Sequence, residues 1–178
     1  RGIGLELSKQ LLAKGYRVTA TARDPEAATD LQALAGNLTV AQLDVTSEES
    51  VSAFAEQIAD PIDLLICNAG VFNALGTIRQ HDHCFAEWQQ ILTTNVIGKY
   101  LVVQALLPLV QASQHKKIAL ISSVLGSSAN AEGGAYPYRA AMAATTNLAK
   151  NLAADLEPDG IAVGTYHPGW VQTDMGRM

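Results

Sequence analysis

The sequence has 178 residues, of which 48% are hydrophobic and 16% charged, and its formal net charge is -5. This length and apolar fraction suit one domain with one core. The acidic balance argues against nucleic acid or an anionic membrane as the main partner, because both favour clustered lysine and arginine. With two cysteines, Cys67 and Cys84, and no visible signal peptide, we expect a reducing, cytoplasmic setting.

The first half of the chain alternates helical and strand-like patterns. Apolar residues recur every four positions from Ile3 to Leu11, and Gly15 follows as a helix stop. Residues 46–49 (Thr-Ser-Glu-Glu) are typical of a capping box, and an apolar stripe from Val51 to Ile58 follows it. The predicted strands of the whole chain are residues 16–22, 39–43, 62–67, 116–122 and 161–166.

The second half contains two long helical patterns. One spans residues 84–112 and is expected to break near Asn95, and the other spans about 137–156. The most apolar long segment, residues 100–110, is too short to span a bilayer. Alternating strands and helices predict an α/β fold with a doubly wound parallel sheet, Rossmann-like, in one domain over residues 1–178. Such sheets bind ligands at the carboxyl ends of their strands.

The two ends of the chain are unusual for such a sheet. The sequence opens on a glycine turn with no strand before it, although the strand feeding that turn is central in a doubly wound sheet. It also stops shortly after the last predicted strand. We therefore expect the first strand and the C-terminal end of the natural protein to be absent here. A sheet built without that strand is the alternative.

Two patterns in the first 25 residues point to a dinucleotide. Glycines before a helix, as in Arg1-Gly2-Ile3-Gly4, let the backbone approach a pyrophosphate, although a plain helix entry has the same pattern. After the first predicted strand, folds that prefer NAD place a carboxylate, whereas an arginine accommodates the 2'-phosphate of NADP. Here Arg23 follows a neutral Ala22, and Arg1 can approach the same phosphate. An ordinary exposed arginine is the alternative.

Six motifs, in order and across nearly the whole chain, resemble those of the short-chain dehydrogenase/reductase family. They are the glycine turn, Asp44-Val45, Cys67-Asn68-Ala69-Gly70, Thr94-Asn95-Val96, the pair Ser122-Ser123 with Tyr138, and the segment Pro168-Gly169-Trp170-Val171-Gln172-Thr173. The details look most like the C-factor and sniffer-type carbonyl reductase branch. The resemblance implies that the first, second, third and last motifs bind the cofactor, through Gly169, Val171 and Thr173 among others.

The resemblance also implies a mechanism. Hydride passes between the nicotinamide and a carbonyl carbon while a tyrosine supplies or removes the proton at oxygen. Tyr138 is the candidate acid or base, Ser123 would hydrogen-bond the substrate oxygen, and Asn95 would hold a water in the proton relay. Tyr136 is the competing tyrosine, but it fits the motif less well.

Met142 departs from the family pattern Tyr-x-x-x-Lys. The family's lysine shares a helix face with the tyrosine, lies beside the cofactor ribose and lowers the tyrosine pKa. Methionine supplies neither charge nor donor, and neither Lys99 nor Lys150 is an obvious substitute. Ala141 also replaces the family's usual serine. The chain is then an impaired relative, an altered variant or a dinucleotide-binding protein that has given up turnover.

Residues 81–84 (His-Asp-His-Cys) could suggest a metal site, but this spacing is more typical of a solvated loop, and we expect no metal. In the family, this region frames the substrate pocket.

The leading hypothesis is an NADP(H)-dependent reductase of small carbonyl compounds, with a carbonyl or alcohol as substrate. A non-catalytic NADP-binding or signalling protein is second, and a structural partner protein is third. The helices around 101–110 and 140–156 resemble the family's interface helices and carry excess apolar surface, so we expect a homodimer or homotetramer.

Overall fold

The protein is described from a computed structural model that covers residues 1–72, 76–80 and 83–173. The chain forms two compact units, each described by itself. The first unit contains Arg1–Ile58 and the segment that begins at Trp170, and the second contains Ala59–Gly169.

The first unit is a two-stranded parallel sheet with helices packed on both strands. Its elements are α1 (Gly2–Ala13), β1 (Val18–Ala22), α2 (Thr29–Gln32), β2 (Leu38–Gln42) and α3 (Glu48–Gln57). β1 pairs with β2 from Val18 opposite Leu38 to Ala22 opposite Gln42. α1 packs on β1 and α3 packs on β2. The carboxyl ends of both strands therefore lie at one edge of this sheet.

Local chemistry explains where these helices begin and end. Ser47 precedes α3, and its hydroxyl accepts a hydrogen bond from the Ser50 amide at 3.1 Å. The cap is thus the second residue of the predicted capping box. Gly15 follows α1 with φ +82°, a left-handed conformation that ends the helix as predicted. Helix α2 was not predicted, because four residues are too few for a periodic pattern.

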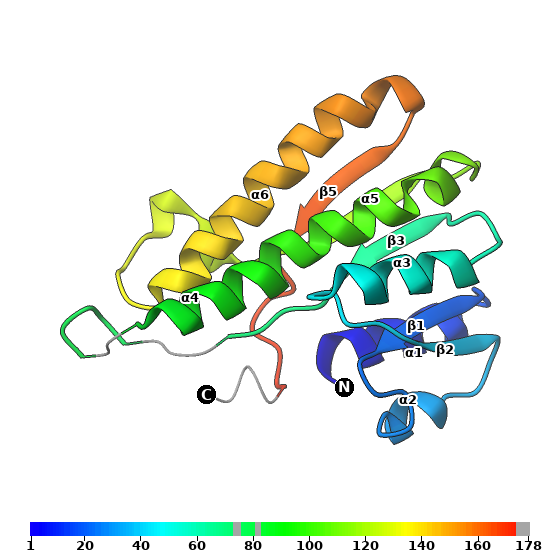
Figure 1. The fold of residues 1–178 in the computed structure, drawn as a ribbon, viewed down its shortest axis with the longest axis horizontal. Helices are drawn as coiled ribbons and strands as arrows, with labels where there is room; N and C mark the ends of the chain where they lie inside the picture. The colour runs from blue at the N-terminus through cyan, green and yellow to red at the C-terminus, as the bar shows by residue number, and fades with distance from the viewer. Residues whose placement is uncertain (73–75, 81–82, 174–178) are drawn as a thin grey trace. The chain divides into compact units, whose positions relative to one another are not determined.

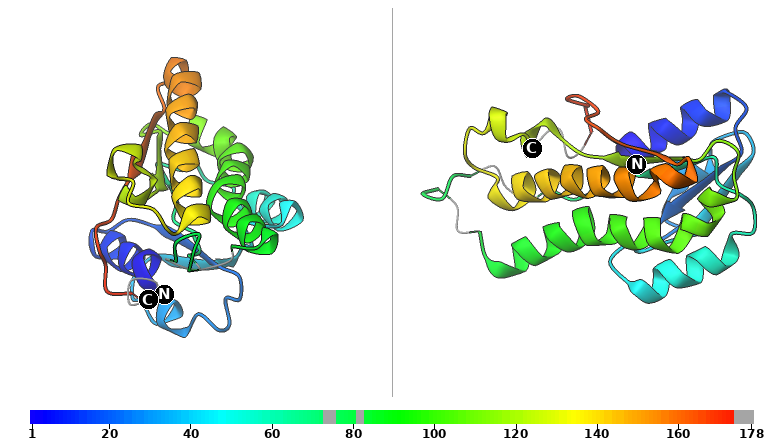
Figure 2. Two further views of the ribbon diagram at one scale, coloured as in Figure 1. Left: turned by 90° about the vertical axis from the view of Figure 1, so that its left-hand side faces the viewer. Right: turned by 90° about the horizontal axis from the view of Figure 1, so that it is seen from above.

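The second unit is a three-stranded parallel sheet, in the order β3-β4-β5, with long helices as connections. Its elements are β3 (Leu64–Cys67), α4 (Phe85–Leu92), α5 (Gly98–Gln111), β4 (Lys117–Ile121), α6 (Tyr136–Leu156) and β5 (Ala162–Tyr166). α5 packs on β3 and β4, and α6 packs on β5. Figure 1 shows α6 running beside β5, and Figure 2 shows α6 beside α4 and α5.

The predicted break near Asn95 is a π-helical segment, Thr93–Ile97, between α4 and α5. The whole stretch Phe85–Gln111 is long and apolar enough to cross a membrane by length and composition alone. In this structure it packs against the sheet and α6 as a core helix, and Asn95 and Lys99 are buried inside it.

Parallel strands joined by helices confirm the predicted α/β, Rossmann-like architecture. The predicted strand bounds agree with the observed ones to within two residues. Among the described residues the strands pair as two separate sheets. That a further strand precedes Arg1 stays a prediction.

Candidate active site

The glycine turn forms the N-terminus of α1 in the first unit. Gly2, the first helical residue, has φ +58°, a conformation that favours glycine. Arg1 precedes the helix, and no side chain caps it. Ile3 is half-buried, and the Gly4 carbonyl accepts a hydrogen bond from the Ser8 hydroxyl at 2.9 Å. The amides of the first turn therefore offer the arrangement that binds an anionic group.

Arg23 follows β1 and lies at an open hollow of about 500 Å³. The residues that line this hollow are Arg23, Asp24, Pro25, Glu26 and Gln42. The Gln42 amide donates to the Arg23 carbonyl at 3.2 Å, which ties the loop after β1 to the end of β2. Asp24 accepts from the Ala27 amide at 3.2 Å and so belongs to the turn itself. The exposed arginine is therefore placed on a defined loop at the edge of the sheet.

Asp44 and the half-buried Val45 follow β2, the neighbouring strand. Asp44 Oδ1 accepts from the Thr46 amide at 2.9 Å and from the Thr46 hydroxyl at 2.7 Å. These hydrogen bonds lower the pKa of Asp44, and the charge of Arg23 lowers it further. Arg23 and Asp44 thus interact at adjacent strand ends, which is where a dinucleotide would meet both.

Asn95 holds the loop that follows β3 in the second unit. Its Oδ1 accepts from the Val71 amide and its Nδ2 donates to the Val71 carbonyl, both at 2.8 Å. A Cβ on Gly70 would lie 3.2 Å from Asn95 Oδ1, so the close approach of the loop favours glycine there. The motif Asn68-Ala69-Gly70 is therefore fixed onto the π-helical segment.

The Asn95 backbone carbonyl has a partner as well. The Thr145 hydroxyl, fully buried on α6, donates to it at 3.0 Å. Both polar atoms of the Asn95 side chain hydrogen-bond Val71, so Asn95 positions this loop, and its predicted relay water stays a prediction. Sequence reasoning gave no role to Thr145.

Ser123 and Tyr138 come together, as predicted. Ser123 is the second residue after β4, and Tyr138 lies in the first turn of α6. Burial raises the pKa of Tyr138 above its ordinary 10.0, while a side-chain hydrogen bond with Ser123 opposes this effect. Phe72 packs its ring edge-on against Tyr138, with ring centroids 4.8 Å apart. The phenol is therefore neutral at physiological pH and able to donate a proton.

Met142 lies one turn after Tyr138, on the same face of α6. It is 2% exposed and forms an apolar cluster with Ile91 and Ala141, against which Tyr138 packs. Thioether and hydrocarbon groups surround the position where the family's pattern has an ammonium. The tyrosine therefore has no cationic neighbour on its own helix face.

A close backbone contact fixes Ser123 relative to α6. A Cβ on Gly126, three residues after Ser123, would lie 2.6 Å from the backbone of Met142 and Ala143. Only a glycine permits this approach. Ser122 adds a second tie, since its hydroxyl donates to the Met142 carbonyl at 3.2 Å. Gly126 was not singled out from the sequence, because its importance depends on the packing of distant segments.

Lys99, which the sequence analysis set aside, is 3% exposed on α5. Its Nζ donates to the Ile121 carbonyl at 2.6 Å, at the last residue of β4. Burial lowers the pKa of Lys99 from 10.5 to about 8, and interaction with Cys67 opposes that shift. In the sequence, the feature that indicates that Lys99 faces the sheet is its position four residues, about one helical turn, after Asn95.

The last predicted motif crosses the boundary between the two units. Pro168 and Gly169, with φ +81° at Gly169, end the second unit. Val171 and Thr173 belong to the first unit, and the Thr173 amide donates to the Val171 carbonyl at 2.8 Å. A Cβ on Gly2 would lie 3.5 Å from the Thr173 methyl group. Thr173 therefore lies beside the glycine turn.

The region around residues 81–84, which the resemblance predicts to frame a substrate pocket, is described only in part, since His81 and Asp82 lie outside the described residues. His83 lies between the Glu87 carboxylate, at 3.2 Å, and the Gly76 carbonyl, at 3.1 Å. Its ring also packs edge-on against Tyr136. Tyr136 therefore packs against the loop, whereas Tyr138 interacts with Ser123.

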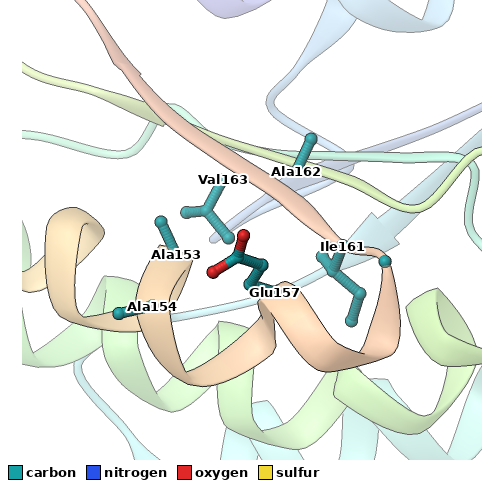
Figure 3. Close-up of a pocket in the computed structure, with 7 residues that line it drawn as sticks. Ala153, Ala154, Glu157, Ile161, Ala162 and Val163 are labelled. Atoms are coloured by element: carbon teal, nitrogen blue, oxygen red, sulfur yellow. The ribbon is translucent and has the colours of Figure 1, made fainter.

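A second hollow, of about 510 Å³, lies far from these residues (Figure 3). Its lining includes Ala153, Glu157 and Val163, at the end of α6 and the start of β5. Tyr138 is at the other end of that helix, roughly 28 Å away at 1.5 Å per residue. This hollow is not part of the candidate active site.

The family model for short chain dehydrogenases matches residues 1–178. The chain therefore belongs to the short-chain dehydrogenase family. An uncharacterized oxidoreductase of Schizosaccharomyces pombe is 36% identical over 189 residues, covering 99% of this chain and 72% of that protein. The C-signal protein of Myxococcus xanthus is 38% identical over 126 residues, covering 70% and 75%.

Solved structures agree with this assignment. The NADPH-bound carbonyl reductase from chicken fatty liver has a TM-score of 0.90 and 35% identity, with 99% of this chain and 78% of that chain covered. The carbonyl reductase Sniffer of D. melanogaster has a TM-score of 0.89 and 28% identity, with 99% and 79% covered. The Pseudomonas aeruginosa RhlG/NADP complex has a TM-score of 0.86 and 30% identity, with 99% and 72% covered. The predicted likeness to carbonyl reductases is confirmed, and a pyridine-nucleotide cofactor is supported.

Proposed function

We propose that this protein is an NADP(H)-dependent reductase of carbonyl compounds, with Tyr138 as the proton donor and with turnover reduced by Met142. The observation that carries the proposal is that the Ser123 side chain interacts with the half-buried Tyr138 phenol and opposes the rise that burial causes in the pKa of Tyr138. A hydroxyl and a neutral phenol held together can bind a carbonyl oxygen and protonate it.

Residues of the first unit would hold the adenosine and pyrophosphate part of the cofactor. The uncapped start of α1 suits the pyrophosphate, and Arg23 beside a neutral Ala22 suits a 2'-phosphate. Asp44 suits the adenosine end of the dinucleotide. The bound nicotinamide supplies the hydride, which is the one chemical function that no side chain provides.

Tyr138 should assist carbonyl reduction better than alcohol oxidation. Because its pKa is raised, the phenol keeps its proton and can donate it to the oxygen of a carbonyl that is being reduced. Alcohol oxidation needs the tyrosinate as a base, which is scarce at neutral pH. We therefore expect reduction to be less impaired than oxidation.

The second candidate function is a non-catalytic NADP-binding protein, and Met142 favours it. The side chain is packed among Ile91, Ala141 and Val96 as an ordinary core residue, so nothing at this position serves proton transfer. In that case the dinucleotide would be a signal rather than a reactant.

Two separate measurements on the full-length protein distinguish these functions: NADPH binding by fluorescence titration, and NADPH oxidation with a panel of aldehydes and ketones. Binding with oxidation supports the reductase, and binding without oxidation on the whole panel supports the binding protein. The absence of both contradicts each of them and leaves a structural partner protein.

A further inference from the structure

Arg139 is a charged residue of α6 that the proposed mechanism does not use. It follows Tyr138 directly in the first turn of the helix, and its side chain is half-buried. Its Nη1 donates to the Leu125 carbonyl at 3.5 Å and to the Asn130 carbonyl at 3.4 Å. Leu125 lies in one 3-10 turn, Val124–Gly126, and Asn130 ends a second one, Ser128–Asn130. One guanidinium therefore contacts both turns of the segment between β4 and α6.

The guanidinium occupies this place at a cost. Its Nε is buried and has no hydrogen-bond partner among the described residues. A buried donor without an acceptor is unfavourable, and an arginine that pointed fully into water would avoid the loss. The contacts with the two carbonyls are the feature of the structure that accounts for the position of this side chain.

Leu125 connects Arg139 with Ser123. The Leu125 amide donates to Ser123 Oγ at 3.2 Å, while the carbonyl of the same residue accepts from Arg139. Because Oγ accepts this hydrogen bond, the hydroxyl hydrogen of Ser123 is left to donate elsewhere. The Ser123 side chain also interacts with Tyr138, which precedes Arg139 in the helix. These contacts form a closed ring from the helix through the turn and back to the phenol.

Other contacts hold the same segment on either side of Leu125. Gly126 packs closely against the backbone of Met142, and the Ser122 hydroxyl donates to the Met142 carbonyl. Arg139 and Met142 are three residues apart and so share one face of α6. Of these contacts, the one from Arg139 is made to the residue whose amide orients the Ser123 hydroxyl.

We propose that Arg139 is a positioning residue for carbonyl reduction, which holds Leu125 so that the Leu125 amide directs the Ser123 hydroxyl toward Tyr138 and the substrate oxygen. Its effect on the rate rests on the proposed function, whereas the orientation of Ser123 does not require turnover. In this role Arg139 touches neither the substrate nor the cofactor.

The ¹³C resonance of the Tyr138 Cζ atom, assigned with Tyr138→Phe, reports the interaction with Ser123 in the full-length protein near neutral pH. Ser123→Ala should shift this resonance, and Arg139→Met should shift it in the same direction. In the Ser123→Ala background, adding Arg139→Met should cause little further shift, because both changes remove the same interaction. Arg139→Lys keeps the charge on a shorter side chain and should give a smaller shift of the same sign.

Two results of this experiment would overturn the proposal. One is a wild-type resonance in Arg139→Met, or in Arg139→Lys should Arg139→Met not fold. The other is a shift of equal size with and without Ser123, since the charge of Arg139 would then act on Tyr138 directly. Lys150→Met removes an exposed cation from the same helix and is the control that should leave the resonance unchanged.

Kinetics give the second readout. Arg139→Met should lower kcat for carbonyl reduction at least roughly tenfold and leave the Kd of NADPH within about twofold of wild type, since other residues would hold the cofactor. Arg139→Lys should lose less than Arg139→Met. An equal loss in kcat and in NADPH affinity would mean that Arg139 supports the fold in general, which contradicts the proposal. A wild type that reduces no carbonyl contradicts the proposed function alone, because the Tyr138 resonance still tests the orientation of Ser123.

Discussion

Methionine and lysine are similar in length, so Met142 can occupy the space of a lysine while changing the electrostatics of the site. Met142 packs with Ile91 and Ala141 in an apolar cluster, and Tyr138 lacks the cation that would stabilise its anion there. At the scale of single residues, the chemistry of this site therefore depends on which charges surround Tyr138 and the cofactor.

Arg23 should determine the choice between the two nicotinamide cofactors. Arg23→Asp should weaken NADPH binding by about tenfold or more, roughly 1.4 kcal/mol, and reverse the preference toward NADH, because a carboxylate repels the 2'-phosphate. Titration of both cofactors measures this. Lys9→Asp, the same charge change at an exposed position of α1, is the control and should leave the preference intact. Equal binding of both cofactors by the wild type would contradict the argument.

Lys99 should make the free energy of unfolding increase as the pH rises above neutrality. Its pKa is about 8 in the folded protein against 10.5 unfolded, so between these values the unfolded chain binds more protons and the free energy of unfolding rises with pH. From pH 7.5 to 9.5 the rise from this group is roughly 2 kcal/mol. Urea unfolding at both pH values should give this difference between wild type and Lys99→Met. Parallel pH dependence in the two proteins would contradict a shifted pKa.

At the scale of elements, the π-helical segment and the loop after β3 form one unit through Asn95. Its side chain uses both polar atoms on Val71, and its carbonyl accepts from Thr145. The loop that carries Asn68 to Gly70 and helix α6 are therefore both attached to the π-helical segment through one buried residue, the loop through its side-chain amide.

Removal of that amide should be costly. Asn95→Ala should lower the free energy of unfolding by roughly 2–3 kcal/mol, since it leaves the Val71 amide and carbonyl without their partner. Asn147→Ala, at an exposed asparagine of α6, is the control and should change stability by less than about 0.5 kcal/mol. Denaturant unfolding measures both. Similar small effects in the two variants would mean that the loop is not held by Asn95.

The sequence predicted helices and strands well where apolar residues recur regularly. It predicted features less well where contacts between distant segments determine the structure. Continuous apolar runs such as residues 118–121 mark a strand that is covered on both faces, and Ile118 and Leu120 are indeed buried. The helix break near Asn95 was predicted, but its π-helical form was not, because no local composition encodes it. The burial of Lys99 and the close contact at Gly126 depend on partners about 20 residues away, which periodicity cannot reveal.

At the scale of the whole molecule, self-association is the expectation that follows from surface composition. On and just before α5, Ile97 and Tyr100 are 49% and 41% exposed, whereas the leucines and valines of this helix are buried or half-buried. Apolar side chains gathered on one helix favour contact with a second copy. We predict a homodimer or homotetramer at micromolar concentration by analytical ultracentrifugation. A monomer under those conditions would contradict this prediction.

The proposed reductase activity depends on whether the charge missing at Met142 limits the reaction. Ser123 interacts with Tyr138, and Asn95 holds the loop after β3, so under this proposal a cation restored at residue 142 should raise the rate. The ammonium would lower the pKa of Tyr138 and make the phenol a stronger acid. In the family's pattern this lysine also lies beside the cofactor ribose.

The most direct measurement is therefore the rate of NADPH oxidation by the wild type and by Met142→Lys, with the same panel of carbonyl compounds and at saturating NADPH. The substitution should raise carbonyl reduction at least roughly tenfold, equivalent to about 1.4 kcal/mol of activation free energy, and shift the pH profile of alcohol oxidation downward. A folded Met142→Lys protein that binds NADPH and is as inactive as the wild type on the whole panel would contradict the account and favour the non-catalytic binding protein.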